Sequence, residues 1–169
     1  MARSLPNVAD LGTPCHIGIV VRDFGAAKAQ LEATIGHRWA DTFDGEMPIL
    51  FGDQHFRLRT RVAWSVQGPC HLELIEAVPD TLWAARSDLD MHHVGYWVDD
   101  IDTVSRQLEA RGMPVEVRFD NGSEVRDVFV YHRGPDGLRI ELGGEQQRNL
   151  VRSRIAVCCG NNGQETDSG

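Results

Sequence analysis

The chain contains one stretch of sequence twice. HIGIVVRDFGAAKAQL begins at His16, and HVGYWVDDIDTVSRQL begins at His93, 77 residues later. Five residue types recur at this spacing: His16 with His93, Gly18 with Gly95, Val21 with Val98, Asp23 with Asp100, and Leu31 with Leu108. Each copy is followed by an apolar-Glu-apolar triplet, Leu72-Glu73-Leu74 in the first and Ile140-Glu141-Leu142 in the second. The repeat predicts two copies of one structural module that share a core.

Each copy predicts a strand, a helix and three further strands. The Ile- and Val-rich segments 14–21 and 92–98 are typical of strands. Asp23 and the Asp99-Asp100 pair are good N-caps, and Gly36 and Gly112 are good helix stops. The extended segments that follow are 38–43, 57–66 and 70–77 in the first copy, and 115–119, 126–132 and 138–142 in the second. We therefore predict an α+β fold of two paired βαβββ modules.

This pattern divides the chain into four parts. Residues 1–13 form a leader, 14–78 the first module and 91–143 the second module. Residues 144–169 are expected to form a polar C-terminal tail that is partly disordered, because no apolar pattern continues past Gly143.

Composition excludes several classes of partner. A net charge of -8 disfavours nucleic acid as the main partner. No apolar run reaches the length of a membrane span. The start of the sequence has no apolar signal region. The four cysteines form no CxxC pair, and Cys15 and Cys70 are expected to be small buried apolar residues. We expect a reduced, cytoplasmic protein.

Strand alternation places four potential metal ligands on one face. Residues Ile17, Ile19 and Val21 share the face toward the helix, and the same parity in the other strands leaves His16, Glu73, His93 and Glu141 on the opposite face. Imidazole and carboxylate together suit one divalent ion: Zn, Ni, Co, Mn or Fe. Four ligands leave two of six positions for substrate oxygens or water, so that the ion can polarise a carbonyl. His92 has the wrong parity for a ligand.

Other residues are candidates for binding substrate. His71 has the ligand parity and is expected near the metal or at the rim. Arg139 shares the face of Glu141, where it could contact substrate or pair with a ligand carboxylate. Trp97 could line a cavity or pack in the core. The alternating Arg57, Arg59 and Arg61 are expected to form a solvated sheet face rather than an anion site.

The segments HIGIVVRDFGAAKAQL, HLELIEAV, MHHVGYWVDDID and GPDGLRIEL resemble the vicinal oxygen chelate superfamily. This superfamily includes glyoxalase I, methylmalonyl-CoA epimerase, extradiol dioxygenases and the bleomycin resistance proteins. The resemblance implies an open, curved mixed β-barrel around a metal, with ligands at His16, Glu73, His93 and Glu141. The MHHVGYWVDDID and LELIEAV segments look closest to the epimerase branch.

The resemblance implies an enzyme that moves a proton beside a metal-bound carbonyl of a small acyl or thioester substrate, as an epimerase, isomerase or glyoxalase-type lyase. Glu141 and Glu73 would then be catalytic as well as ligands. The epimerase comparison requires a further carboxylate base, for which Glu46, Asp53 and His55 are the nearby candidates. An Fe(II) extradiol-type dioxygenase and a non-catalytic binding or resistance protein remain alternatives. A homodimer is implied by the resemblance only.

Overall fold

The computed structural model describes residues 11–122 and 128–160. In this part of the chain, two βαβββ units are followed by a third helix. The first unit comprises β1 (His16–Val21), α1 (Phe24–Ile35), β2 (Phe43–Phe51), β3 (Gln54–Trp64) and β4 (His71–Glu76). The second unit comprises β5 (Leu89–Trp97), α2 (Ile101–Glu109), β6 (Val115–Phe119), β7 (Phe129–Arg133) and β8 (Arg139–Gly143), and α3 (Glu145–Gly160) follows it.

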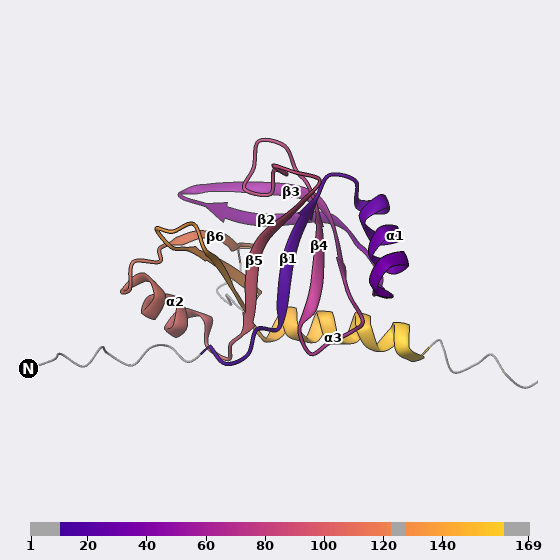
Figure 1. The fold of residues 1–169 in the computed structure, drawn as a ribbon. Coiled ribbons are helices and arrows are strands. Elements are labelled where there is room, and N and C mark those ends of the chain that lie inside the picture. Colours follow the sequence, from indigo (N-terminus) through magenta and orange to yellow (C-terminus); the bar gives the residue numbers. More distant parts are fainter. Residues whose placement is uncertain (1–10, 123–127, 161–169) are drawn as a thin grey trace, which may run out of the picture.

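The eight strands form a mixed β-barrel in the order β1-β4-β3-β2-β6-β7-β8-β5 (Figure 1). The two modules join within one chain, where β1 runs antiparallel to β5. They join again where the ends of β2 and β6 pair over three residues. The predicted mixed barrel is therefore confirmed. The pairing of β2 with β6 closes this barrel, whereas we expected an open one.

The helix caps follow the sequence. The Asp23 side chain accepts a hydrogen bond from the backbone N–H of Ala26, and the Asp100 side chain accepts one from Thr103. Gly36 ends α1 with a φ of 69°, a left-handed conformation that favours glycine. These caps fix where each helix leaves its first strand, so both helices pack on the outer face of the barrel.

Because alternate side chains of each strand face opposite sides of the barrel wall, the core is divided into layers. Ile19, Val21 and Leu74 pack under α1, and Ile140 and Leu142 pack with α2. The residues of opposite parity point into the barrel, where a third cluster contains Val20, Ile75, Leu58, Trp83, Val117 and Tyr131. The side chains predicted to face inward on β1 and β4 do so.

Two predicted strand positions differ from the structure. The second strand lies at Phe43–Phe51 rather than 38–43, and in the earlier segment only Trp39 forms an isolated bridge, with Ser65. Gly45 and Pro48 lower the strand propensity of the true segment, which is why the pattern misplaced it. The predicted strand 126–132 begins outside the described residues, and β7 starts at Phe129.

The expected tail contains a helix. Residues 145–160 form α3, while residues 161–169 lie outside the described part. Figure 1 shows α3 lying across one end of the strands β5, β1 and β4. Four α3 residues at helical spacing contact the body of the protein: Gln147, Val151, Arg154 and Cys158. Only Val151 among them is a large apolar residue, so hydrophobic periodicity could not reveal the helix.

The expectation for the cysteines is right for Cys15, which is buried, and wrong for Cys70, which is exposed. Among the described residues, no helix combines the length and apolar character that a membrane span requires.

Candidate metal centre

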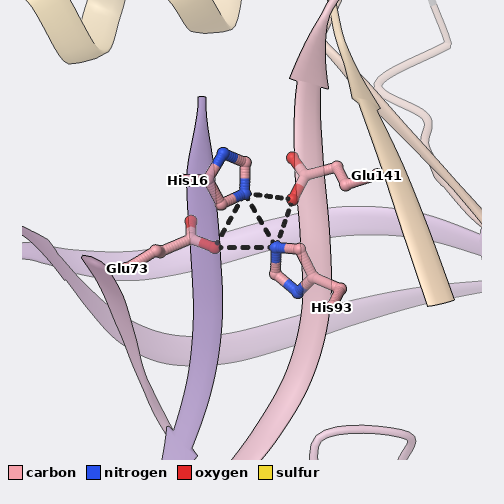
Figure 2. Close-up of side chains that lie close together, drawn as sticks. All are labelled: His16, Glu73, His93 and Glu141. Carbon is pink, nitrogen blue, oxygen red and sulfur yellow. Dashed lines mark hydrogen bonds and ion pairs between the residues drawn. The ribbon is translucent and has the colours of Figure 1, made fainter. Parts of the chain in front are cut away.

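Four side chains from four strands meet inside the barrel: His16 from β1, Glu73 from β4, His93 from β5 and Glu141 from β8 (Figure 2). We call this group the quartet. One ligand atom from each residue lies within 4.8 Å of the other three, and all four residues are buried. Each module supplies one histidine and one glutamate, as the repeat predicted.

The distances in the quartet suit a single ion. His93 Nε2 lies 2.7 Å from Glu141 Oε2 and 3.2 Å from Glu73 Oε2, and 2.8 Å from His16 Nε2. Donor atoms bound at about 2.1 Å to one ion are about 3.0 Å apart when their bonds are at right angles. Glu73 Oε2 is buried and lies 3.2 Å from His93 Nε2 and 3.6 Å from His16 Nε2. Two imidazoles and two carboxylates in this arrangement fit a divalent cation.

Charge coupling inside the quartet is strong. Burial lowers the pKa of His93, but the carboxylates of Glu141 and Glu73 outweigh burial and raise that pKa to about 9. Burial raises the pKa of Glu141, whereas the charges and hydrogen bonds of His16 and His93 lower it well below the usual range. Both pKa shifts favour the charged forms, a protonated His93 and an ionised Glu141, which attract each other.

Two glycines make room for the histidine rings. A Cβ atom on Gly18 would lie 1.9 Å from Cε1 of His93, and one on Gly95 would lie 1.8 Å from Cε1 of His16. Each ring therefore rests on the glycine of the other module. This contact explains why the repeat contains a glycine two residues after each ligand histidine.

His92 lies inside the barrel, contrary to its predicted parity. The β1–β5 pairing shifts between Gly18 and Ile19, so that His93 pairs with Gly18 while Met91 pairs with Ile19. His92 is the extra residue of this bulge, and the bulge turns its side chain inward. Its ring stacks on Trp83 with 6.1 Å between ring centroids. The prediction that His92 is not in the ligand set agrees with the quartet, but the parity argument behind it was wrong.

His92 fixes the orientation of His93. Its Nε2 lies 3.0 Å from the carbonyl oxygen of Leu82 and must donate to it. Burial, followed by the charges of His93 and Arg139, lowers the pKa of His92 to about 2, so its Nδ1 is unprotonated. That atom lies 2.9 Å from Nδ1 of His93 and accepts its hydrogen. Nε2 of His93 is thereby directed at the other quartet atoms.

Gln147 of α3 also contacts the quartet. Its Nε2 donates to Glu141 Oε1 at 2.6 Å, and the residue is 9% exposed. No sequence pattern indicated this residue, because Gln147 lies outside the repeat and in the segment expected to be a tail. Cys15 is a further neighbour, with Sγ 3.2 Å from Nδ1 of His16. Burial, with the nearby Glu141 charge, raises the pKa of this thiol.

The predicted substrate residues lie in different places. Trp97 is closest to the quartet, 6.0 Å between ring centroids from both His16 and Trp64. His71 Nδ1 donates to the carbonyl oxygen of Ser65 at 2.8 Å and lies beside Trp64. Arg139 pairs with Glu116, not with a quartet carboxylate, at 2.5 Å and 2.9 Å.

The arginine-rich strand forms ion pairs on the outer face of the barrel, as expected. Arg61 pairs with Glu76, Arg59 with Asp44 and Arg57 with Glu46. The side chains of Arg59 and Arg57 are more than 70% exposed, so these contacts add little stability.

Comparison with known proteins agrees with this architecture. The family model for the glyoxalase/bleomycin resistance protein/dioxygenase superfamily matches residues 15–131. The chain belongs to this superfamily, which is the vicinal oxygen chelate superfamily that its sequence resembles. No curated protein sequence matches the chain.

Several solved structures share the fold. Methylmalonyl-CoA epimerase from Mycobacterium tuberculosis is 16% identical, with 82% of this chain and 91% of that chain covered and a TM-score of 0.53. A variant of the Streptomyces coelicolor epimerase in complex with 2-nitronate-propionyl-CoA is 21% identical, with coverages of 76% and 94% and a TM-score of 0.53. A mutant 4-hydroxymandelate synthase from S. coelicolor is 16% identical, with coverages of 88% and 54% and a TM-score of 0.53. At these identities the similarity establishes the fold.

Proposed function

We propose that the quartet binds one divalent metal ion and that the protein catalyses proton transfer at the carbon next to a carbonyl. Epimerase, isomerase and glyoxalase-type lyase reactions all belong to this class. The observation that carries the proposal is the approach of Glu73 and Glu141 to the histidine pair from opposite sides (Figure 2). A reaction that removes a proton from one face of a carbon and returns it to the other needs two bases placed in this way.

His16, Glu73, His93 and Glu141 would hold the ion, for which zinc, nickel, cobalt, manganese and iron are the candidates. When bound, it would polarise the substrate carbonyl and lower the pKa of the adjacent C–H. The chain itself supplies two carboxylates, a buried and water-poor surrounding, and the rings of Trp64 and Trp97 beside His16. Trp97 is the predicted substrate residue best placed to touch a ligand of the quartet.

The two carboxylates are held differently. Glu141 is held by Gln147 and by both histidines, whereas Glu73 contacts only the two histidines, at the longer distances of 3.2 Å and 3.6 Å. Glu73 is therefore the less tightly held of the two carboxylates, and Glu141 the more firmly positioned. The further base that the epimerase comparison requires has no candidate at the quartet. Glu46 pairs with Arg57, Asp53 is exposed in the turn between β2 and β3, and His55 is exposed beside Asp120.

We infer the class of substrate from the structurally similar proteins. The epimerase structures include complexes with methylmalonyl-CoA and with 2-nitronate-propionyl-CoA. An acyl thioester is accordingly the first substrate to test. A ligand set of four differs from the triad of two histidines and one carboxylate that is typical of Fe(II) oxygenases, which disfavours the dioxygenase alternative.

The test is deuterium exchange. The protein, loaded in turn with each candidate metal, is incubated with methylmalonyl-CoA in D2O, and deuterium at the α-carbon is measured by mass spectrometry. We expect exchange by the wild type, a loss of at least about 100-fold in Glu73→Gln and Glu141→Gln, and no loss in Glu46→Gln, a matched change of an exposed glutamate. Elemental analysis of the wild type and of His93→Ala tests the metal separately.

Three results would redirect the proposal. Iron together with O2 consumption on an aromatic diol would favour the dioxygenase. Stoichiometric metal without exchange on any acyl thioester or hemithioacetal would favour a binding protein. Absence of metal after incubation with every candidate ion would refute the metal centre itself.

A further inference from the structure

A second cavity, open to the surface, lies apart from the quartet. A cavity of about 680 Å³ lies between the β2–β3 hairpin, the segment 80–86 and the beginning of β8. No quartet residue is among the described residues that line it. Trp83 forms one wall, and its other neighbours include His92, which contacts His93. The Trp83–His92 pair thus lies between the cavity and the quartet. A volume of this size is in the usual range for sites that bind small molecules.

The charged residues of the cavity are mainly positive. Four arginines and two acidic residues line it: Arg57, Arg86, Arg133, Arg139, Asp80 and Glu116. Of these, Arg57 is already paired with Glu46 on the outer face of the barrel. The whole chain, by contrast, carries a net charge of -8. A local excess of cations in an acidic protein attracts anions to this one place.

The buried part of this group is built around Glu116. Arg139 binds both oxygens of Glu116, and Arg133 contacts Oε1 at 3.3 Å. The side chains of Arg139 and Glu116 are only 10% and 14% exposed. Because one carboxylate faces two guanidinium groups, the cluster keeps one uncompensated positive charge. Arg86 also lines the cavity, and its charge interacts with the nearby Asp90.

The apolar walls are aromatic. Phe51 and Phe56, at the ends of β2 and β3, line the cavity and remain 46% and 44% exposed. Trp83 faces the same space and is almost fully buried. Large aromatic side chains that stay exposed around a hollow are a common feature of ligand sites. Aromatic walls beside guanidinium groups fit a flat apolar body that carries an oxyanion.

We propose that this cavity binds an organic anion, a carboxylate or phosphate attached to a flat apolar body, and does so independently of the metal centre. The guanidinium groups of Arg86 and Arg133 hold the oxyanion, and Phe51, Phe56 and Trp83 enclose the apolar part. The proposal does not rest on the proton-transfer reaction.

The experiment compares three probes with the same ring system by isothermal titration calorimetry at pH 7. The probes are 2-naphthoate, 2-naphthyl phosphate and neutral 2-naphthol. We expect at least one of the two anions to bind ten or more times more tightly than 2-naphthol. The better anion identifies which oxyanion the site prefers. We also expect the same affinity in the presence of zinc and in the presence of EDTA.

Variants separate the site from general attraction to the protein. Arg86→Gln/Arg133→Gln should weaken the binding of the better anion at least tenfold, and Phe56→Ala should weaken all three probes. Arg152→Gln, a matched change of an exposed arginine on α3, should leave each affinity unchanged. Arg86 and Phe56 are exposed and the Arg133 side chain is 43% exposed, so we expect these variants to fold, which circular dichroism verifies. Equal affinity for anions and 2-naphthol, an unaffected double variant, or loss of binding in EDTA would each overturn the proposal.

Discussion

The imidazole of His16 lies directly over the Cα atom of Gly95, so that an added Cβ would be 1.8 Å from its Cε1 atom. The two residues belong to different modules and meet where β1 pairs with β5. The same contact recurs between His93 and Gly18. The module junction and the metal centre are therefore one structure, because each module positions the ligand of the other.

This relationship predicts the effect of Gly95→Ala. The new methyl group would displace the His16 ring from the quartet, and its overpacking would cost about 1–3 kcal/mol of stability. We expect metal affinity, measured by competition with a chelator, to fall by about 100-fold or more. Gly25→Ala is the control. A Cβ at this position on α1 has an ordinary nearest contact of 3.7 Å. This change should preserve metal affinity and raise the free energy of unfolding by up to about 1 kcal/mol.

The hydrogen bond between His92 and His93 predicts a second effect on metal binding. In His92→Phe the ring would remain but the acceptor for the Nδ1 hydrogen of His93 would be lost. We expect metal affinity to fall about 10- to 100-fold. His92→Asn, which keeps an acceptor near the position of Nδ1, should recover most of that loss. Equal affinities of the two variants would contradict the proposed role of this hydrogen bond.

Gln147 allows a sharp comparison with its neighbour. Gln147→Ala would leave the buried Oε1 of Glu141 without its donor, whereas Gln146 is exposed. We expect Gln147→Ala to lower the free energy of unfolding by about 1–3 kcal/mol and to weaken metal binding. Gln146→Ala should change neither quantity by more than about 0.5 kcal/mol. Urea denaturation and chelator competition measure both. If the two variants behave alike, α3 has no part in positioning Glu141.

The quartet could be predicted from sequence because two regularities coincide. Strand alternation assigns each residue to a face, and the repeat applies the same assignment twice. The prediction fails where the period of two is broken: the bulge in β5 turns His92 inward, and no local pattern of apolar residues reveals a bulge. It also fails for Gln147, whose helix contacts the barrel largely through polar side chains. The closure of the barrel depends on three residue pairs between β2 and β6, which are distant in sequence.

The raised pKa of His93 predicts how metal binding depends on pH. The pKa of His93 is about 9 in the folded, metal-free protein against an ordinary value of 6.5, so the proton on His93 stabilises that state. This stabilisation is complete below pH 6.5 and is lost as the pH rises through 9. Chelator-treated protein should accordingly lose stability to urea between pH 7 and pH 10.

A metal ion must displace the same proton, because only neutral imidazole binds it. We therefore expect metal affinity to rise about tenfold per pH unit from pH 7 to pH 9 and then to level off. At pH 7 the protein should release about one proton per ion bound. Calorimetry in two buffers with different ionisation enthalpies measures this number directly. A value near zero at pH 7, or an affinity that is flat from pH 7 to pH 9, would mean that His93 is already neutral in the metal-free protein.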